Sequence, residues 1–109
     1  MAYKQEFLDY VNDQLSDLDN IVTKKMFGGV GFFREGIMFG MIGDGRFRLR
    51  VDDENRGDYE AYDMGPLLSK AKGKSMPYYE VPMAVLEDRD VLKKWAEFAF
   101  VVARRNSKK

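Results

Sequence analysis

The chain has 109 residues, of which 45% are hydrophobic and 33% charged, and its 18 basic and 18 acidic residues give a formal net charge of +0. This balance indicates one globular domain over residues 1–109, and it argues against disorder and against a strongly basic nucleic-acid-binding protein. The chain has no histidine and no cysteine, which excludes imidazole bases, disulfides and thiolate chemistry.

The first predicted element is an amphipathic helix over residues 4–18. Its apolar residues recur at three- and four-residue spacing, at Phe7, Val11, Leu15 and Leu18. Aspartates and a glutamine fill the positions between them, so one side of this helix is expected to pack on the rest of the domain.

Three consecutive antiparallel strands are predicted over residues 25–51, whose sequence is KMFGGVGFFREGIMFGMIGDGRFRLRV. Two tight turns join them, at Glu35-Gly36 and at Asp44-Gly45, where glycine supplies the positive φ that two-residue hairpin loops require. In the third strand, arginine alternates with apolar residues, so one edge of the sheet is expected to carry a row of like charges.

Two-residue turns also decide which side chains share a face of the sheet. They predict that Phe33 lies opposite Met38, and Ile42 opposite Phe47. One face then carries Gly29, Gly31, Phe33, Met38, Gly40, Ile42, Phe47, Leu49 and Val51. The other carries Val30, Phe32, Arg34, Ile37, Phe39, Met41, Arg46, Arg48 and Arg50. We expect helices on the glycine-bearing face, where absent side chains permit a close approach, and a second sheet, a partner or a ligand on the other.

The second half of the chain begins with weaker signals. A short helix is predicted over residues 56–62, residues 67–74 are ambiguous, and a fourth strand is predicted over residues 78–81. Pro77 and Pro82 bound this strand, which favours a position at the edge of the sheet or a strand end.

A long C-terminal helix is predicted after Asp88, which is a suitable N-cap. Arg104 and Arg105 in its last turn complement the helix dipole. Its apolar stripe consists of Val91, Trp95, Phe98 and Val102, widened by Leu92, Ala96, Ala99 and Ala103. Trp95 and Phe98 are expected to fill the volume above the sheet glycines.

Basic residues form the candidate site for an anion or a nucleic acid. They are Arg34, Arg46, Arg48 and Arg50, together with a loop containing Lys70, Lys72 and Lys74. Interleaved with Phe32 and Phe39, the arginines suggest a stacking surface for single strands, but we favour a solvated strand edge whose charges discourage aggregation. Gly73-Lys74-Ser75 ends like a Walker motif, but the first glycine of that motif would fall at Leu68, so the motif fails.

Two segments and the helix after them carry a family resemblance. The segments are MFGGVGFFREGIMFGMIGDGRFRLRVDD and SMPYYEVPMAVLED, and the helix contains Leu92 and Trp95. Over roughly residues 7–103 the chain resembles the N-terminal domain of the TfoX/Sxy family, bacterial regulators of natural competence. The resemblance implies a compact α+β fold and a regulatory role, in which competence members assist transcription of DNA-uptake genes together with the cAMP receptor protein. It supplies no catalytic residues, and we expect a stand-alone form without the C-terminal helical domain of longer members.

Together these observations predict an α+β fold, in which an antiparallel sheet of consecutive hairpins has the N- and C-terminal helices packed on one face. The expected function is that of a non-enzymatic regulatory module, without cofactor or metal, which contacts a protein partner or itself as a homodimer. Its interface is predicted at Phe32, Phe39, Met41 and Arg48. Direct nucleic-acid binding is the alternative. Neither a signal-peptide pattern nor an apolar run of roughly 20 residues is present, so a cytoplasmic protein without a membrane segment is expected.

Overall fold

The computed structural model describes residues 4–26, 28–43, 45–69 and 74–107, apart from the side chains of residues 67–69, 74 and 75. The elements are, in chain order, α1 (Gln5–Gln14), β1 (Ile21–Met26), β2 (Gly29–Arg34), β3 (Ile37–Gly43), β4 (Arg46–Arg50), α2 (Arg56–Glu60), β5 (Pro66–Ser69), β6 (Lys74–Glu80), α3 (Met83–Leu86) and α4 (Arg89–Asn106). No helix among these residues is long and apolar enough to cross a membrane.

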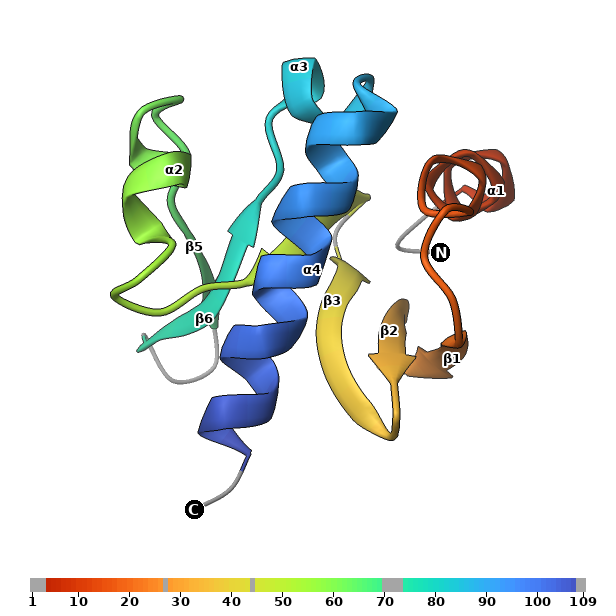
Figure 1. The fold of residues 1–109 in the computed structure, drawn as a ribbon, viewed down its shortest axis with the longest axis horizontal. Coiled ribbons are helices and arrows are strands. Elements are labelled where there is room, and N and C mark those ends of the chain that lie inside the picture. Colours follow the sequence, from red (N-terminus) through yellow and green to blue (C-terminus); the bar gives the residue numbers. More distant parts are fainter. Residues whose placement is uncertain (1–3, 27, 44, 70–73, 108–109) are drawn as a thin grey trace.

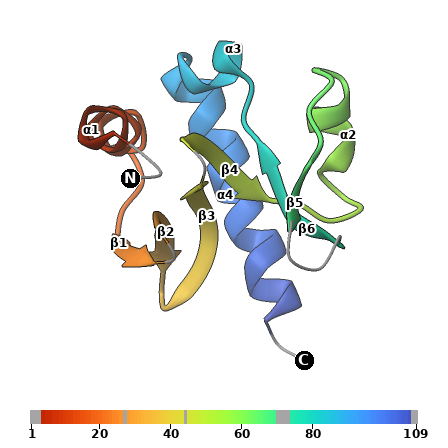
Figure 2. The same cartoon turned by 180° about the vertical axis from the view of Figure 1, so that it is seen from behind.

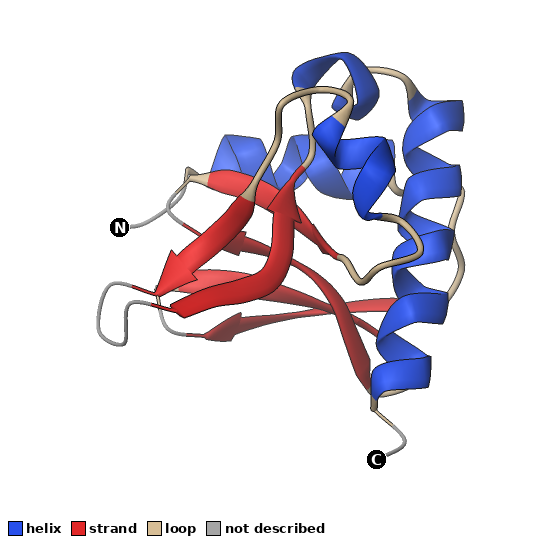
Figure 3. Ribbon diagram, turned by 90° about the vertical axis from the view of Figure 1, so that its left-hand side faces the viewer, coloured by secondary structure: helices blue, strands red, loops and turns tan. Residues whose placement is uncertain are grey.

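The strands form one antiparallel sheet in the order β1-β2-β3-β4-β6-β5. Helix α4 runs across one face of this sheet and packs on β3 and β4, with α1 near one end and α2 near the other (Figure 1). From behind, the strands lie in front of α4 and none of the described helices covers them (Figure 2). The sheet is strongly twisted, as its edge-on view shows (Figure 3). The predicted α+β class, with consecutive hairpins and packed terminal helices, is confirmed.

The first hairpin turn forms as predicted. Arg34 pairs with Ile37, and the two loop residues Glu35 and Gly36 have φ values of 54° and 78°. Positive φ at both positions is the type I′ geometry that matches the twist of the flanking strands. The second hairpin pairs Gly43 with Arg46, in the predicted register, although Asp44 lies outside the described residues.

An irregularity in β3 changes the predicted division of the two sheet faces. Phe33 pairs with Met38, but Phe32 pairs with Gly40, so Phe39 is an extra residue in the ladder between β2 and β3. Such a bulge reverses the alternation of side chains beyond it. Residues beyond Phe39 therefore lie on the opposite face from the one predicted relative to the residues before it. The predicted division of the sheet faces is wrong.

The core lies between α4, α1 and the face of the sheet formed by Val30, Phe32, Phe39, Ile42, Phe47 and Leu49. Phe32 meets Phe47 edge-on with ring centroids 5.2 Å apart, and Phe39 meets Phe100 of α4 at 6.4 Å. Helices therefore cover the phenylalanine-bearing face and not the face with Gly29 and Gly31, contrary to expectation.

Helix α4 begins and ends at the predicted residues but presents a different side. Asp88 caps it by accepting a hydrogen bond from the Val91 amide at 3.2 Å. Phe98 is 36% exposed, and Trp95 packs on Tyr59 and not above the glycines. The buried side consists of Leu92, Ala96, Ala99, Phe100, Val102 and Ala103.

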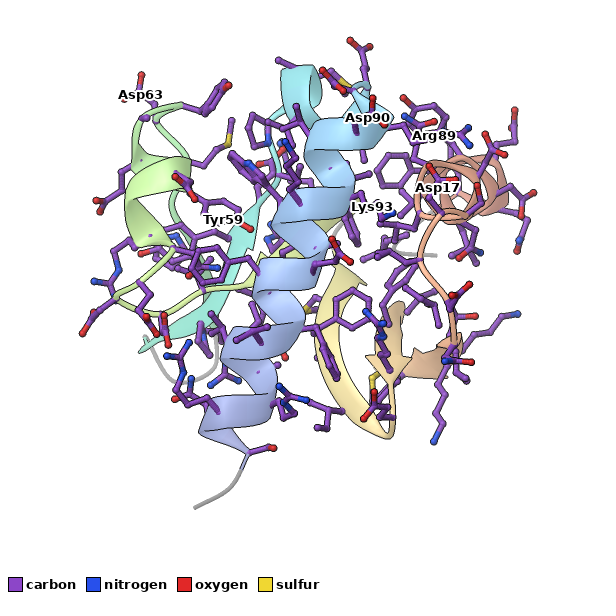
Figure 4. All side chains as sticks on the ribbon, in the orientation of Figure 1. Asp17, Tyr59, Asp63, Arg89, Asp90 and Lys93 are labelled. Atoms are coloured by element: carbon purple, nitrogen blue, oxygen red, sulfur yellow. The ribbon has the colours of Figure 1, made fainter. Side chains whose placement is uncertain are left out.

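Polar contacts fasten α1 to the end of α3 and to the start of α4. Arg89 donates to the Asp13 carboxylate at 3.0 Å and to the Ser16 hydroxyl at 3.1 Å, and its side chain lies beside α1 in Figure 4. The Gln14 amide donates to the Leu86 carbonyl at 2.9 Å. Helix α1 ends at Gln14, earlier than predicted.

Strand β6 differs from its prediction in place and length. It lies between β4 and β5, not at an edge, and it runs through Pro77. Proline lacks an amide proton, but its carbonyl still accepts a hydrogen bond from the Val51 amide at 2.9 Å. Because β6 covers its flank, β4 is an inner strand, and its arginines do not form a strand edge.

Tyr59 of α2 is buried in an aromatic cluster against α4. Its ring centroid lies 4.6 Å from that of Trp95 and 5.8 Å from that of Tyr79, and Figure 4 shows the side chain extending from α2 toward α4. Its hydroxyl has no hydrogen-bond partner within the described part of the chain. An unpaired buried hydroxyl costs on the order of 1–3 kcal/mol.

We expect Tyr59→Phe to raise the free energy of unfolding by about 1 kcal/mol at neutral pH, because it removes this unpaired group. The variant should also change how the free energy of unfolding depends on pH in alkaline solution. Burial, with Asp58 nearby, raises the pKa of Tyr59, and burial raises that of Tyr78 against the opposing effect of Arg50.

The folded state keeps these protons where the unfolded state has lost them, so this stability is present below about pH 10 and falls as the pH rises. The free energy of unfolding, measured with urea, should fall between about pH 8 and about pH 10.5. This fall should be smaller in Tyr59→Phe than in the wild type. Equal losses in the two proteins would contradict the assignment.

Candidate functional site

The side of the sheet opposite α4 carries no helix among the described elements (Figure 2). We call it the helix-free face. Strand register places on it the side chains of Val22, Lys24 and Met26 from β1, Phe33 from β2, Met38 and Met41 from β3, Arg46, Arg48 and Arg50 from β4, and Tyr78 and Glu80 from β6.

The centre of the helix-free face is apolar and rich in methionine. A methyl group placed on Gly31 would lie 2.8 Å from the Met26 sulfur, 2.8 Å from the Phe33 ring and 3.1 Å from the Met38 sulfur. These three side chains therefore fold over the bare backbone of Gly31 and are half-buried by one another. Methionine side chains adapt their shape and suit a surface that binds a partner.

Arginine side chains form one margin of this apolar centre, and each has a contact within the domain. Arg46 donates to both carboxylate oxygens of Glu80, at 3.1 and 3.0 Å. Arg48 is buried and donates to the Gly43 carbonyl at 2.5 Å. Arg50 lies 5.7 Å from the centre of the Tyr78 ring. The row is thus a fixed part of the sheet and not a fringe of mobile cations.

The opposite margin belongs to the edge strand β1. Lys24 lies 5.2 Å above the Phe33 ring, and Val22 is 53% exposed. The helix-free face is therefore an apolar strip between a lysine margin and an arginine margin.

Two clefts are lined by described residues, and each includes one arginine from the margin of the helix-free face. The first, of about 480 Å³, is lined by Arg50, Val51, Asp52, Asp53, Glu54, Arg56, Pro77, Arg105 and Asn106. Its charges pair with one another: Arg105 binds Glu54, and Arg56 binds Asp53 at 2.6 Å. These ion pairs tie the end of α4 to the loop after β4, and no group of three or more acidic side chains in the described residues could hold a metal ion.

The second cleft, of about 400 Å³, is lined by Phe7, Gly45, Arg46, Phe47, Met64, Glu80, Val81, Met83 and Leu86. Most of the residues that line it are apolar, and Arg46 and Glu80, which also line it, form an ion pair. Neither cleft brings together groups that resemble an acid–base pair or an activated nucleophile.

Most of the sequence matches the model of a known protein family. The family described as the TfoX N-terminal domain matches residues 13–103, from the end of α1 to the last turns of α4. The chain belongs to the TfoX N-terminal domain family. A search of curated proteins finds no match to this TfoX N-terminal domain.

The predicted interface residues of this TfoX N-terminal domain do not share one surface. Phe32 and Phe39 are 0% and 1% exposed beneath α4, so the prediction is wrong for both. Met41 and Arg48 do lie on the helix-free face, where the Met41 methyl and the Arg48 guanidinium approach each other over Gly43. The bulge at Phe39 is the physical reason for this split.

The predicted anion-binding residues are also divided. Arg34 lies on the helix side, with its guanidinium 5.1 Å from the centre of the Phe100 ring. Arg46, Arg48 and Arg50 point away from it, on the helix-free face. Lys70, Lys72 and the side chain of Lys74 lie outside the described residues.

The predicted division of the sheet did not place Met26, Phe33 and Met38 on the helix-free face. It assigned Phe33 and Met38 to the face that the helices were expected to cover, and it began the sheet at Lys25, which omits most of β1. The glycine at position 31 is the signal that points to them, since bulky neighbours fold over a bare backbone position.

Proposed function

We propose that this TfoX N-terminal domain is a non-enzymatic module that binds another protein through its helix-free face. The supporting observation is the strip of Met26, Phe33, Met38 and Met41 on a sheet face over which no described helix lies. Apolar surface rimmed by polar residues is typical of sites where proteins bind one another.

The contacts of the arginines favour a protein partner over a nucleic acid. Affinity for nucleic acid comes chiefly from cations that displace counterions at phosphates. Arg46 is already paired with Glu80, and Arg48 is buried against the Gly43 carbonyl. The strip between the two margins is apolar, which suits a protein surface and offers little to a phosphate backbone.

The proposed role of this contact is regulatory. Resemblance to the competence regulators of the TfoX/Sxy family implies action on transcription, and a module without catalytic groups acts there by holding a partner. Most of the affinity would come from the apolar strip. Its methionine and phenylalanine side chains, with arginines along one margin, resemble the centre of a protein interface.

A photocrosslinking amino acid at position 33 tests this proposal. Placed there in living cells, it should crosslink this domain to one defined protein, which mass spectrometry identifies. The matched control is position 98, a partly exposed phenylalanine in α4 on the other side of the sheet. Phe33 crosslinks should disappear in a Met38→Asp variant that keeps its fold. Equal products from positions 33 and 98, or none from position 33, would refute the proposal.

A further inference from the structure

We propose that the second cleft, beside α1 and α3, binds an apolar amino acid in its zwitterionic form. Binding there does not depend on the function proposed for the helix-free face. The cleft lies at the end of the sheet where β4 begins and β6 ends, and α1 and α3 lie at that same end (Figure 2). Two features of the cleft carry the inference: its apolar lining, and an ion pair that still has hydrogen-bonding positions to offer.

The apolar lining of the cleft combines buried and exposed side chains. Phe47, Val81 and Leu86 are buried, Phe7 is half-buried, and Met83 is 60% exposed. The volume of about 400 Å³ lies within the range of small-molecule sites and has room for one side chain of the size of leucine or phenylalanine. An exposed methionine can adapt its shape to a ligand. The cleft therefore suits a small molecule with one apolar group.

Arg46 and Glu80 supply the charges of the cleft. The Arg46 Nη1 atom donates to both carboxylate oxygens of Glu80, at 3.1 and 3.0 Å. Within the described residues this pairing uses a single nitrogen of the guanidinium, and the Arg46 side chain is 57% exposed. Nε and Nη2 can therefore donate to a ligand, and each Glu80 oxygen keeps a lone pair that can accept. Because the pair is neutral as a whole, it favours a ligand that is also neutral as a whole.

An amino acid matches this pair better than a ligand with a single charge. A lone carboxylate would be attracted by Arg46 and repelled by Glu80, and a lone ammonium would meet the opposite problem. An α-amino acid carries both charges on one carbon atom, so its carboxylate can bind Arg46 while its ammonium binds Glu80. Both contacts are charge-assisted hydrogen bonds, and the ion pair stays intact. The side chain on the same carbon then extends toward Phe47, Val81 and Leu86.

Ligand titration of the intact chain tests the inference, with L-phenylalanine as the probe. Methyl NMR signals of Met64 and Met83 should shift, because both residues line the cleft, whereas that of Met38 on the helix-free face should not. Titration up to about 10 mM covers the affinities expected of so small a ligand. The matched ligands are phenylpropionate, which lacks the ammonium, and phenethylamine, which lacks the carboxylate. Each should bind at least about tenfold more weakly, since each leaves one member of the ion pair without a ligand contact.

Two substitutions should change the order of these ligands in opposite ways. Glu80→Gln should weaken L-phenylalanine about tenfold but leave phenylpropionate bound at least as tightly as in the wild type, because the repelling carboxylate is gone. Arg46→Gln should weaken both L-phenylalanine and phenylpropionate, and it should not weaken phenethylamine. An exposed ion pair contributes little to stability, so both variants should keep a cooperative urea transition.

Asp13→Asn is the matched protein control. It removes the Arg89–Asp13 ion pair, which has the same 3.0 Å length as the Arg46–Glu80 pair but does not line the cleft. We expect it to leave the affinity for L-phenylalanine unchanged. A weakening equal to that caused by Glu80→Gln would contradict the inference.

The ligand comparison on the unaltered protein is decisive in its own right. Equal binding of L-phenylalanine and the two matched ligands would overturn the zwitterion, and no shift of Met64 and Met83 at about 10 mM would overturn binding at this cleft. Shifts that follow protein concentration and not ligand concentration would assign the cleft to contacts between copies of the chain, and would overturn the inference as well. Crosslinking at position 33 decides the proposed function separately, whatever the ligand result.

Discussion

Replacing Phe39 by aspartate is expected to unfold the domain. The side chain is 1% exposed, lies under α4 and meets Phe100 edge-on. Removing a buried phenylalanine costs about 3–5 kcal/mol, and placing an unpaired carboxylate there adds several more. Domains of this kind have about 5–15 kcal/mol of total stability, so we expect loss of the cooperative urea transition and of the native circular dichroism spectrum.

The matched control is Phe33→Asp. Phe33 is half-buried on the helix-free face, where a carboxylate can remain in water beside Lys24. This variant should keep a cooperative transition and lose no more than about 2 kcal/mol, while losing the proposed interaction. If Phe39→Asp folded as well as Phe33→Asp, the bulge and the assignment of the two faces would be wrong.

Gly29→Ala is expected to have the second largest effect. A methyl group at this buried position of β2 would overlap the backbone carbonyl oxygen of Ile42 in β3. A flexible side chain could rotate away, but a carbonyl within a strand can move only if the ladder moves with it. Overpacking of this kind costs about 1–3 kcal/mol and occasionally more, and we expect a loss of about 3 kcal/mol.

Gly57→Ala separates this steric effect from the general effect of adding a methyl group. Nothing lies within 4 Å of the position such a methyl would take in α2, and alanine favours the helix. We expect Gly57→Ala to be neutral or to stabilise the domain by about 0.4–1 kcal/mol, measured by the same urea titration. A Gly29→Ala variant as stable as the wild type would show that β2 and β3 lie farther apart than described.

Features decided by neighbouring residues could be predicted from the sequence. The Glu35-Gly36 turn depends on a glycine that adopts positive φ without strain, and the start of α4 depends on one aspartate before an apolar stripe. Both are local, so the sequence contains all the information they require. The α+β class follows from them.

The division of the sheet faces could not be predicted, because residues 37–42 are almost all apolar. Alternation then fits either register equally well, and nothing marks Phe39 as the extra residue. The decision comes from packing: with the bulge, Phe32 and Phe39 both lie beneath α4. Strand β1 was missed for a related reason, since a partly exposed edge strand with two lysines has little apolar pattern.

The wrong division of the sheet faces also led to errors in the predicted site. Met41 and Arg48 were predicted correctly for the helix-free face because they lie beyond the bulge, whereas Phe33 and Met38 lie before it and were assigned to the core. The central position of β4 depends on β6, a strand that contains Pro77 and was expected at an edge. Long-range pairing of this kind leaves no mark within a short window of sequence.

The position of α4 in the chain has a consequence during protein synthesis. All six described strands precede α4, so the hairpins of β1 to β4 can pair while the helix that covers their phenylalanines has not yet been made. At synthesis rates of about 5–20 residues per second, the 18 residues of α4 arrive a second or more after the strands. The nascent chain therefore exposes Phe32, Phe39 and Phe47 during that interval, and this apolar surface is where aggregation, or protection by a chaperone, would begin.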